Sequence, residues 1–195
     1  MASITSLCVF TGSSVGFHPD HAASVSALGR ALAARGLRLI YGGGRVGLMG
    51  VLADAVIDAG GEAVGVIPRF LEAKEVAHSR LTHLHVVDTM HARKALMAEL
   101  SDGFIMLPGG WGTFDEMFEI LTWAQLGLHQ KPCGMLNVRG YYDGLLAFME
   151  HSVTEGFVNP RCRQFLAVAT EPVALLDALA VFTPPVIDKV ADAKG

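Results

Sequence analysis

The chain has 195 residues, of which 51% are hydrophobic and 17% are charged, and its formal net charge is −4. A chain of this length is expected to form one domain over residues 1–195, with a core large enough to fold without disulfides or a structural metal. The low charged fraction argues against an intrinsically disordered chain. The acidic balance disfavours nucleic acid or an anionic membrane as a partner, because both attract a basic excess.

The cysteines and the N-terminus favour a cytoplasmic protein. Cys8, Cys133 and Cys162 are far apart and form no C-x-x-C motif, which fits reduced thiols better than a disulfide framework or a zinc site. The first nineteen residues contain no Lys or Arg, so no signal peptide is expected. Charges interrupt every apolar stretch before about 18 residues, so no transmembrane helix is expected.

Helical patterns and apolar runs alternate along the chain. Helices are expected at residues 19–35, 48–59, 90–100, 113–126, 142–151 and 173–180, with Gly36 ending the first and Thr89 capping the third. Buried strands are expected at residues 4–10, 37–41, 63–67, 84–87, 103–107 and 132–138, with a short apolar run at 165–169. Residues 69–82 are polar and predict an irregular, functional loop. The alternation indicates an α/β fold with helices on both faces of a parallel sheet.

Loops rich in glycine or polar residues follow the expected strands. They are Gly12-Ser13-Ser14, Gly42-Gly43-Gly44, residues 68–82 and Pro108-Gly109-Gly110. Because ligands of open α/β sheets bind at the carboxyl ends of the strands, we expect ligand contacts from these loops. The first two contribute Gly12, Ser13, Gly43 and Gly44.

The first glycine-rich segment, residues 42–47, satisfies G-x-G-x-x-G. A dinucleotide-binding loop also needs an acidic residue at the end of the next strand, but that strand ends in Ile67-Pro68-Arg69. The pattern therefore disfavours a nicotinamide cofactor. A nest of backbone amides for phosphate and a simple tight turn both remain open.

The second glycine-rich segment, residues 108–116, combines three glycines with the start of a helix. Glycines let the backbone approach a ligand, and the free N–H groups of a first helical turn attract an anion. Thr113 adds a hydroxyl donor. Thr113 and Glu116 also match the capping box T-x-x-E, so capping and catalysis are both possible roles, and the spacing alone favours capping.

Arg93 and Lys94 lie in the first turn of an expected helix. Cations there oppose the helix dipole, which hints at an anionic partner. A solvated helix face is the alternative. His83 and His85 alternate on a strand, but no third metal ligand accompanies them, so we interpret them as ordinary strand residues.

Three motifs together resemble those of the LOG family. They are Gly42-Gly43-Gly44 with Gly47-Leu48-Met49-Gly50, then Met90-His91-Ala92-Arg93-Lys94, then Pro108-Gly109-Gly110-Trp111-Gly112-Thr113-Phe114-Asp115-Glu116. The family consists of cytokinin riboside 5′-monophosphate phosphoribohydrolases, often mislabelled as lysine decarboxylases. The resemblance covers roughly residues 4–182 and includes Trp-Ala-Gln-Leu-Gly at residues 123–127.

The resemblance implies a Rossmann-like three-layer fold, a homodimer and no metal or redox cofactor. It implies hydrolysis of the N-glycosidic bond of cytokinin riboside 5′-monophosphate or AMP to the free base and ribose 5-phosphate. Arg93 and Glu116 match the family's catalytic pair. Its substrate contacts fall on Glu75, Lys94, Gly110, Trp111, Gly112, Thr113, Phe114, Asp115 and Thr122.

The implied chemistry is physically reasonable. The carboxylate of Glu116 would stabilise an oxocarbenium-like sugar and position or deprotonate the attacking water. The phosphate would sit on the amides of residues 109–113, Gly109 included, and Arg93 would either hold phosphate and ribose or help the base to leave. A non-catalytic nucleotide-binding module is the alternative. A decarboxylase would need pyridoxal phosphate on a lysine, and only Lys94 lies near the expected site.

Overall fold

The computed structural model describes residues 4–75 and 77–185, and the side chains of residues 73–75 lie outside that description. One parallel sheet holds seven strands in the order β4-β3-β2-β1-β5-β6-β7. The strands are β1 (Ser6–Phe10), β2 (Arg38–Tyr41), β3 (Ala63–Pro68), β4 (His83–Val87), β5 (Gly103–Met106), β6 (Cys133–Leu136) and β7 (Leu166–Ala169). The parallel α/β sheet predicted from the apolar runs is therefore confirmed.

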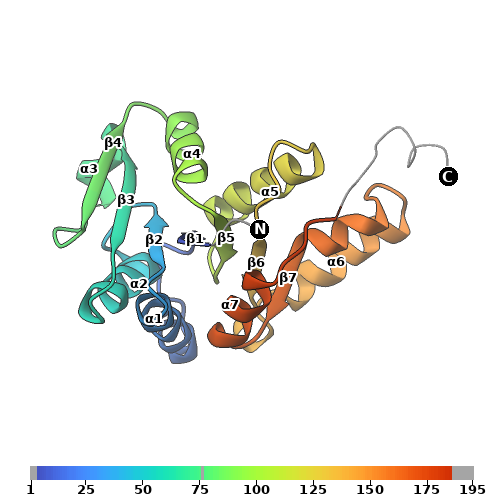
Figure 1. Ribbon diagram of the computed structural model, residues 1–195, viewed down its shortest axis with the longest axis horizontal. Helices are drawn as coiled ribbons and strands as arrows, with labels where there is room; N and C mark the ends of the chain where they lie inside the picture. The colour runs from blue at the N-terminus through green and yellow to red at the C-terminus, as the bar shows by residue number, and fades with distance from the viewer. Residues whose placement is uncertain (1–3, 76, 186–195) are drawn as a thin grey trace.

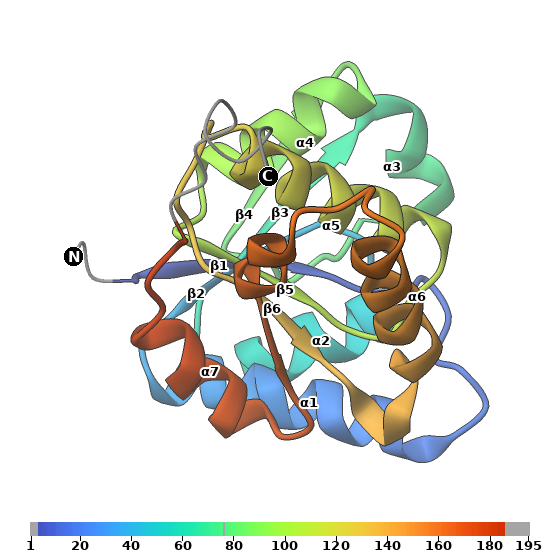
Figure 2. The same cartoon turned by 90° about the vertical axis from the view of Figure 1, so that its right-hand side faces the viewer.

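Helices cover both faces of this sheet, as Figures 1 and 2 show. One face carries α1 (Pro19–Ala34), α2 (Gly47–Asp58) and α7 (Pro172–Ala180), and the other carries α4 (Met90–Glu99) and α5 (Trp111–Gln125). The remaining helices are α3 (Arg69–Glu75), α6 (Asp143–Thr154) and the short 3-10 helices η1 (Val138–Gly140) and η2 (Pro160–Phe165). None of the helices in the described part of the chain is long and apolar enough to cross a membrane.

The side chains of β1 show how the two faces are buried. Leu7 and Val9 join the core beneath α1 and α2, whereas Cys8 and Phe10 join the core beneath α4 and α5. Successive side chains of a strand point to opposite faces. A continuous apolar run is therefore needed where both faces are covered, and that is the pattern from which the sheet was predicted.

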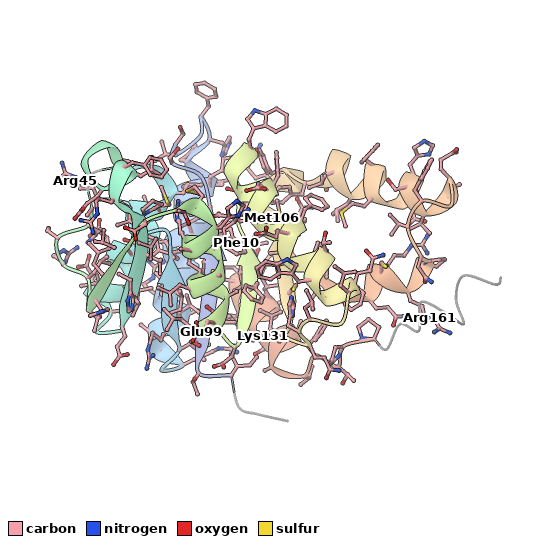
Figure 3. All side chains as sticks on the ribbon, turned by 90° about the horizontal axis from the view of Figure 1, so that it is seen from above. Phe10, Arg45, Glu99, Met106, Lys131 and Arg161 are labelled. Atoms are coloured by element: carbon pink, nitrogen blue, oxygen red, sulfur yellow. The ribbon has the colours of Figure 1, made fainter. Side chains whose placement is uncertain are left out.

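The strand order reverses beside β1, which places a crevice between β1 and β5. Phe10 and Met106 pair at the carboxyl ends of these strands and lie side by side in Figure 3. From there β1 leads to α1 on one face and β5 leads to α5 on the other. Ligands of such folds bind in this crevice, so the loops after β1 and β5 are the first candidates for a site.

Two local predictions were confirmed and one was wrong. Gly36 follows α1 with a φ of +64°, a conformation that glycine adopts without strain. The Thr89 hydroxyl caps α4 by accepting a hydrogen bond of 3.1 Å from the Ala92 N–H. The expected irregular loop at 69–82, however, begins with α3, because Leu, Glu, Ala and Lys in this segment favour a helix.

Candidate active site

Three strand-end loops meet at the crevice. The Gly12 N–H donates a hydrogen bond of 3.1 Å to the Pro108 carbonyl oxygen, which joins the loops after β1 and β5. Gly47 has a φ of +61°, and a Cβ built on it would lie 2.1 Å from the Ser13 carbonyl carbon. Only glycine allows this approach, so the loop after β2 also contacts the loop after β1.

A cavity of about 300 Å³ opens where the loops after β1 and β5 meet. Its walls are residues 12–16, residues 108–110, His21, Leu48 and Tyr141. Of the predicted contacts, Gly12, Ser13, Gly109 and Gly110 line this cavity, whereas Gly43 and Gly44 do not. The Gly43 carbonyl oxygen instead accepts a hydrogen bond from the His78 N–H.

The first turn of α5 lies beside this cavity without a side-chain cap. Gly110 is the N-cap and Trp111 begins the helix. Thr113 is therefore the third residue of the helix rather than its cap, and the predicted capping box is wrong. The Thr113 hydroxyl packs against Gly109, because a Cβ built on Gly109 would stand only 2.1 Å from the Thr113 hydroxyl oxygen. The leading N–H groups of α5 thus have no side-chain cap, which suits an anion.

Arg93 is buried rather than solvated, with 6% of its surface exposed. Its Nη2 donates to the Gly42 carbonyl oxygen at 3.3 Å, and its Nη1 lies 3.9 Å from the Met90 sulfur. Its Nε is buried and has no hydrogen-bond partner among the described residues. The alternative of a solvated helix face is thereby excluded for Arg93. A buried guanidinium with an unused donor suits an anionic ligand.

Glu116 lies half-buried in α5, on the same face of the sheet as Arg93. Both charges act on one buried atom, the Cys8 thiol of β1. Burial raises the pKa of Cys8, the negative charge of Glu116 raises it further, and the positive charge of Arg93 lowers it. Arg93 in α4 and Glu116 in α5 therefore belong to the two helices that cover the face of the sheet on which the Cys8 side chain is buried.

Lys94 joins α4 to α5. Its ammonium lies 3.2 Å from Asp115 and 3.0 Å from Glu119. Burial favours a lower pKa for Lys94, but hydrogen bonds to the carboxylates of Glu119 and Asp115 outweigh it and raise the pKa. Lys94 and Asp115, both predicted substrate contacts, are therefore brought together as a tie between the helices that carry Arg93 and Glu116.

The other predicted contacts are dispersed. Trp111 is largely exposed and packs edge-to-face on Phe114, with ring centroids 6.1 Å apart. Gly112 follows Trp111 in the first turn of α5. Thr122 lines a separate apolar groove between α5 and α6. Glu75 ends α3, and its side chain lies outside the described residues.

His21 and Tyr141 line the cavity, although neither was predicted. The Tyr141 hydroxyl donates a hydrogen bond of 2.6 Å to the Gly109 carbonyl oxygen. Tyr141 follows the end of β6, so the rule that selected the other strand-end loops could have found it. His21 lies in the first turn of α1 and carries no comparable signal. Within residues 4–75 and 77–185, no cluster of three or more His, Cys, Asp or Glu could hold a metal ion.

Comparison with known proteins identifies the family. A family model described as "Possible lysine decarboxylase" matches residues 49–179. A cytokinin riboside 5′-monophosphate phosphoribohydrolase of Rhodococcoides fascians is 53% identical over 167 residues, which cover 85% of this chain and 84% of the relative. The chain belongs to the LOG family. An Arabidopsis thaliana LOG-family protein with the same enzyme name is 44% identical over 189 residues, covering 97% of this chain and 88% of its own.

Solved structures match the LOG-family fold at lower identity. The molybdenum cofactor carrier protein of Chlamydomonas reinhardtii superposes with a TM-score of 0.66 at 20% identity, covering 89% of this chain and 94% of its own. The molybdenum cofactor binding protein of Rippkaea orientalis gives a TM-score of 0.64, also at 20% identity, covering 88% and 91%. These likenesses confirm the Rossmann-like architecture that the LOG resemblance implied.

Proposed function

We propose that this LOG-family protein activates cytokinins by hydrolysing the N-glycosidic bond of an adenine-type nucleoside 5′-monophosphate. The products would be the free base and ribose 5-phosphate. The carrying observation is that the buried cation of Arg93 in α4 and the carboxylate of Glu116 in α5 lie on one face of the sheet, with Arg93 hydrogen-bonded to the glycine loop after β2 and α5 beginning at the glycine loop after β5. The names of relatives at 44–53% identity support the same reaction.

The bond changes require one carboxylate and one water molecule. The oxygen of water attacks the anomeric carbon, and the bond from that carbon to the purine nitrogen breaks. The electron pair leaves with the base, which takes up a proton. The Glu116 carboxylate stabilises the oxocarbenium-like sugar and accepts or directs the proton of the attacking water. The fixed charge of Arg93 would meet the anionic side of the substrate.

The 5′-phosphate is the anchor of this proposal. The uncapped amides at the start of α5 offer a site for its charge. Binding energy from a phosphate remote from the reacting bond can lower the barrier by several kcal/mol. Nucleosides without the phosphate are therefore expected to be poor substrates.

The test is incubation of the protein with AMP, isopentenyladenosine monophosphate, GMP, CMP and adenosine, followed by chromatography of the released bases. We expect base from the adenine-type monophosphates and far less from adenosine. Release from adenosine as fast as from AMP would contradict the phosphate anchor. Binding of AMP without release of any base would identify a nucleotide-binding module instead of a hydrolase.

We also infer that two copies of the chain associate through the groove between α5 and α6. This groove has a volume of about 620 Å³ and is lined mainly by apolar side chains, among them Phe118, Leu145 and Phe148. Thr122, a substrate contact implied by the LOG resemblance, lies in this groove and not in the cavity between the loops. If a second copy bound in this groove, Thr122 would lie against that copy and could contribute to a substrate site formed by residues of both chains.

Light scattering after size exclusion tests the association. Phe148→Glu places a charge in the groove and is expected to give a monomer, because an unpaired charge is costly to bury. Phe157→Glu is the matched control, since Phe157 is also exposed but does not line the groove. A wild-type monomer, or a dimer that both variants retain, would contradict this arrangement.

A further inference from the structure

The carbonyl groups of the loop after β5 are engaged by the protein itself. The Leu107 carbonyl oxygen accepts a hydrogen bond of 2.5 Å from the Tyr142 hydroxyl. The Pro108 carbonyl oxygen accepts one of 3.1 Å from the Gly12 N–H. The Gly109 carbonyl oxygen accepts one of 2.6 Å from the Tyr141 hydroxyl. Three successive carbonyls are therefore turned toward protein donors.

Two N–H groups of the same loop have no such partners. Proline has no N–H, and the Leu107 N–H donates to the Phe10 carbonyl oxygen at 2.9 Å, so the loop can offer only those of Gly109 and Gly110. Within residues 4–75 and 77–185, neither donates to a backbone carbonyl oxygen. A trans peptide is planar, with its C=O and N–H pointing in opposite directions. Holding the Gly109 carbonyl therefore also fixes the direction of the Gly110 N–H, at the start of α5.

The ring of Tyr141 is itself held in place. It packs edge-to-face on His21, with centroids 5.8 Å apart, and on Tyr142, with centroids 4.8 Å apart. The turn that carries both tyrosines is braced by Asn137, whose Oδ1 accepts a hydrogen bond of 2.8 Å from the Tyr142 N–H. The hydroxyl of Tyr141 thus meets Gly109 from a fixed direction, and the bond joins segments 32 residues apart.

The hydroxyl of Tyr141 is not free to donate to a ligand. A tyrosine hydroxyl has a single proton, and here that proton is directed to the Gly109 carbonyl oxygen. The oxygens of an ionised phosphate are acceptors, so they would compete for this proton. The geometry therefore favours an indirect role for Tyr141 over a direct contact with phosphate.

We propose that Tyr141 is a positioning residue for phosphate binding. Its hydroxyl holds the Gly109–Gly110 peptide in the orientation that presents the Gly110 N–H, together with the first amides of α5, to the 5′-phosphate. The inference rests on the proposed function, because it assigns the anion to the substrate's phosphate. It adds a residue that contacts neither the reacting atoms nor the phosphate.

Calorimetric titration with ribose 5-phosphate and with ribose tests this role. Tyr141→Phe removes the hydroxyl but keeps the ring packing on His21 and Tyr142. We expect it to bind ribose 5-phosphate about tenfold more weakly, as for the loss of one charge-assisted hydrogen bond, with unchanged affinity for ribose. In turnover, KM for the monophosphate should rise more than kcat falls, whereas a purely structural role would lower the melting temperature instead.

Tyr41→Phe is the matched control. Tyr41 is fully buried, and its hydroxyl has no hydrogen-bond partner in the described part of the chain. This variant should bind ribose 5-phosphate like the wild type. Equal losses in the two variants would overturn the proposal, since removal of a tyrosine hydroxyl that makes no bond to the loop would then have the same effect.

Three further outcomes separate this inference from the proposed function. Unchanged affinity of Tyr141→Phe for ribose 5-phosphate, with base release by the wild type, would overturn the role of Tyr141 and leave the hydrolase intact. Tyr141-dependent binding of ribose 5-phosphate without base release from any nucleotide would support the role and refute the hydrolase. A wild type that does not bind ribose 5-phosphate would overturn the role, because no phosphate site would exist.

Discussion

The Arg93 guanidinium lies directly against Gly42. Its Nη2 donates a hydrogen bond of 3.3 Å to the Gly42 carbonyl oxygen, and a Cβ built on Gly42 would stand 2.0 Å from the same nitrogen. The missing side chain at residue 42 is therefore what leaves space for the buried cation. The glycine loop after β2 therefore positions the Arg93 side chain directly.

Gly42→Ala should reduce activity while leaving the fold intact. The new methyl group would meet the far end of a flexible side chain, so Arg93 would shift before the backbone does. A displacement of a catalytic group by about 1 Å can cost about 100-fold in rate, and we expect a loss of kcat/KM of that order in the assay of base release. Gly144→Ala is the control, because a Cβ there meets nothing within 4 Å. Equal activity of both variants would show that the position of Arg93 does not matter.

Glu116→Gln should abolish turnover without loss of ligand binding. Glutamine preserves size but cannot carry the negative charge or accept a proton from water, so kcat should fall by roughly 10² to 10⁴. The affinity for ribose 5-phosphate should remain that of the wild type. Glu99→Gln is the control, since Glu99 is exposed at the C-terminal end of α4, whereas Arg93 lies near the start of that helix (Figure 3). Near-normal turnover in Glu116→Gln would remove this carboxylate from the mechanism.

The two carboxylates that bind Lys94 should contribute unequally to stability. The Glu119 side chain is 27% exposed and that of Asp115 is 63% exposed, whereas the shared Lys94 side chain is only 13% exposed. Exposed ion pairs contribute about 0.2–1 kcal/mol, and hydrogen bonds to less exposed charges contribute about 1.5–3 kcal/mol. Urea unfolding should therefore show a larger loss for Glu119→Gln than for Asp115→Asn. The reverse order would mean that solvent exposure does not determine how much each ion pair with Lys94 contributes to stability.

The strands and their terminal loops could be predicted because their signals are local. An apolar run such as Leu7–Val9 in β1 records burial on both faces of a sheet, and the glycines after it mark where the chain turns. The start of α5 could not be placed as reliably. Thr113 and Glu116 match a capping box, but the helix begins at Trp111, because glycine at residue 110 serves as the N-cap.

The burial of Arg93 and the bond of Tyr141 are not local properties. Arg93 reaches Gly42 across 51 residues, and Tyr141 reaches Gly109 across 32 residues. Neither separation matches the repeat of a helix or a strand, so neither contact could be predicted from the sequence pattern. Both follow only once the strand order brings the ends of β2, β1, β5 and β6 together.

Asp102 should make stability depend on acidic pH. Its carboxylate accepts hydrogen bonds from the Thr5 N–H at 2.8 Å and from the Ser6 N–H at 3.0 Å, which ties the start of β1 to the start of β5. Burial alone would raise the pKa of Asp102, but the hydrogen bonds from Thr5 and Ser6 lower it below its ordinary value of 3.8. A carboxyl whose pKa is lower in the folded state stabilises the fold above the pKa of the unfolded state. This contribution is lost as the pH falls through the pKa of the folded state.

Asp102→Asn tests that dependence by urea unfolding at a series of pH values. At pH 7 the wild type should be more stable by about 1–2 kcal/mol, since hydrogen bonds to a charged acceptor are stronger than those to a neutral one. The difference should begin to shrink below a pH of about 4 and should nearly vanish once Asp102 is protonated, because both side chains are then neutral. Asp177→Asn, at a carboxylate that is 65% exposed and paired with Arg35, should show little difference at any pH. A constant gap between wild type and Asp102→Asn across the range would mean that packing, and not the charge of the carboxylate, stabilises this end of the sheet.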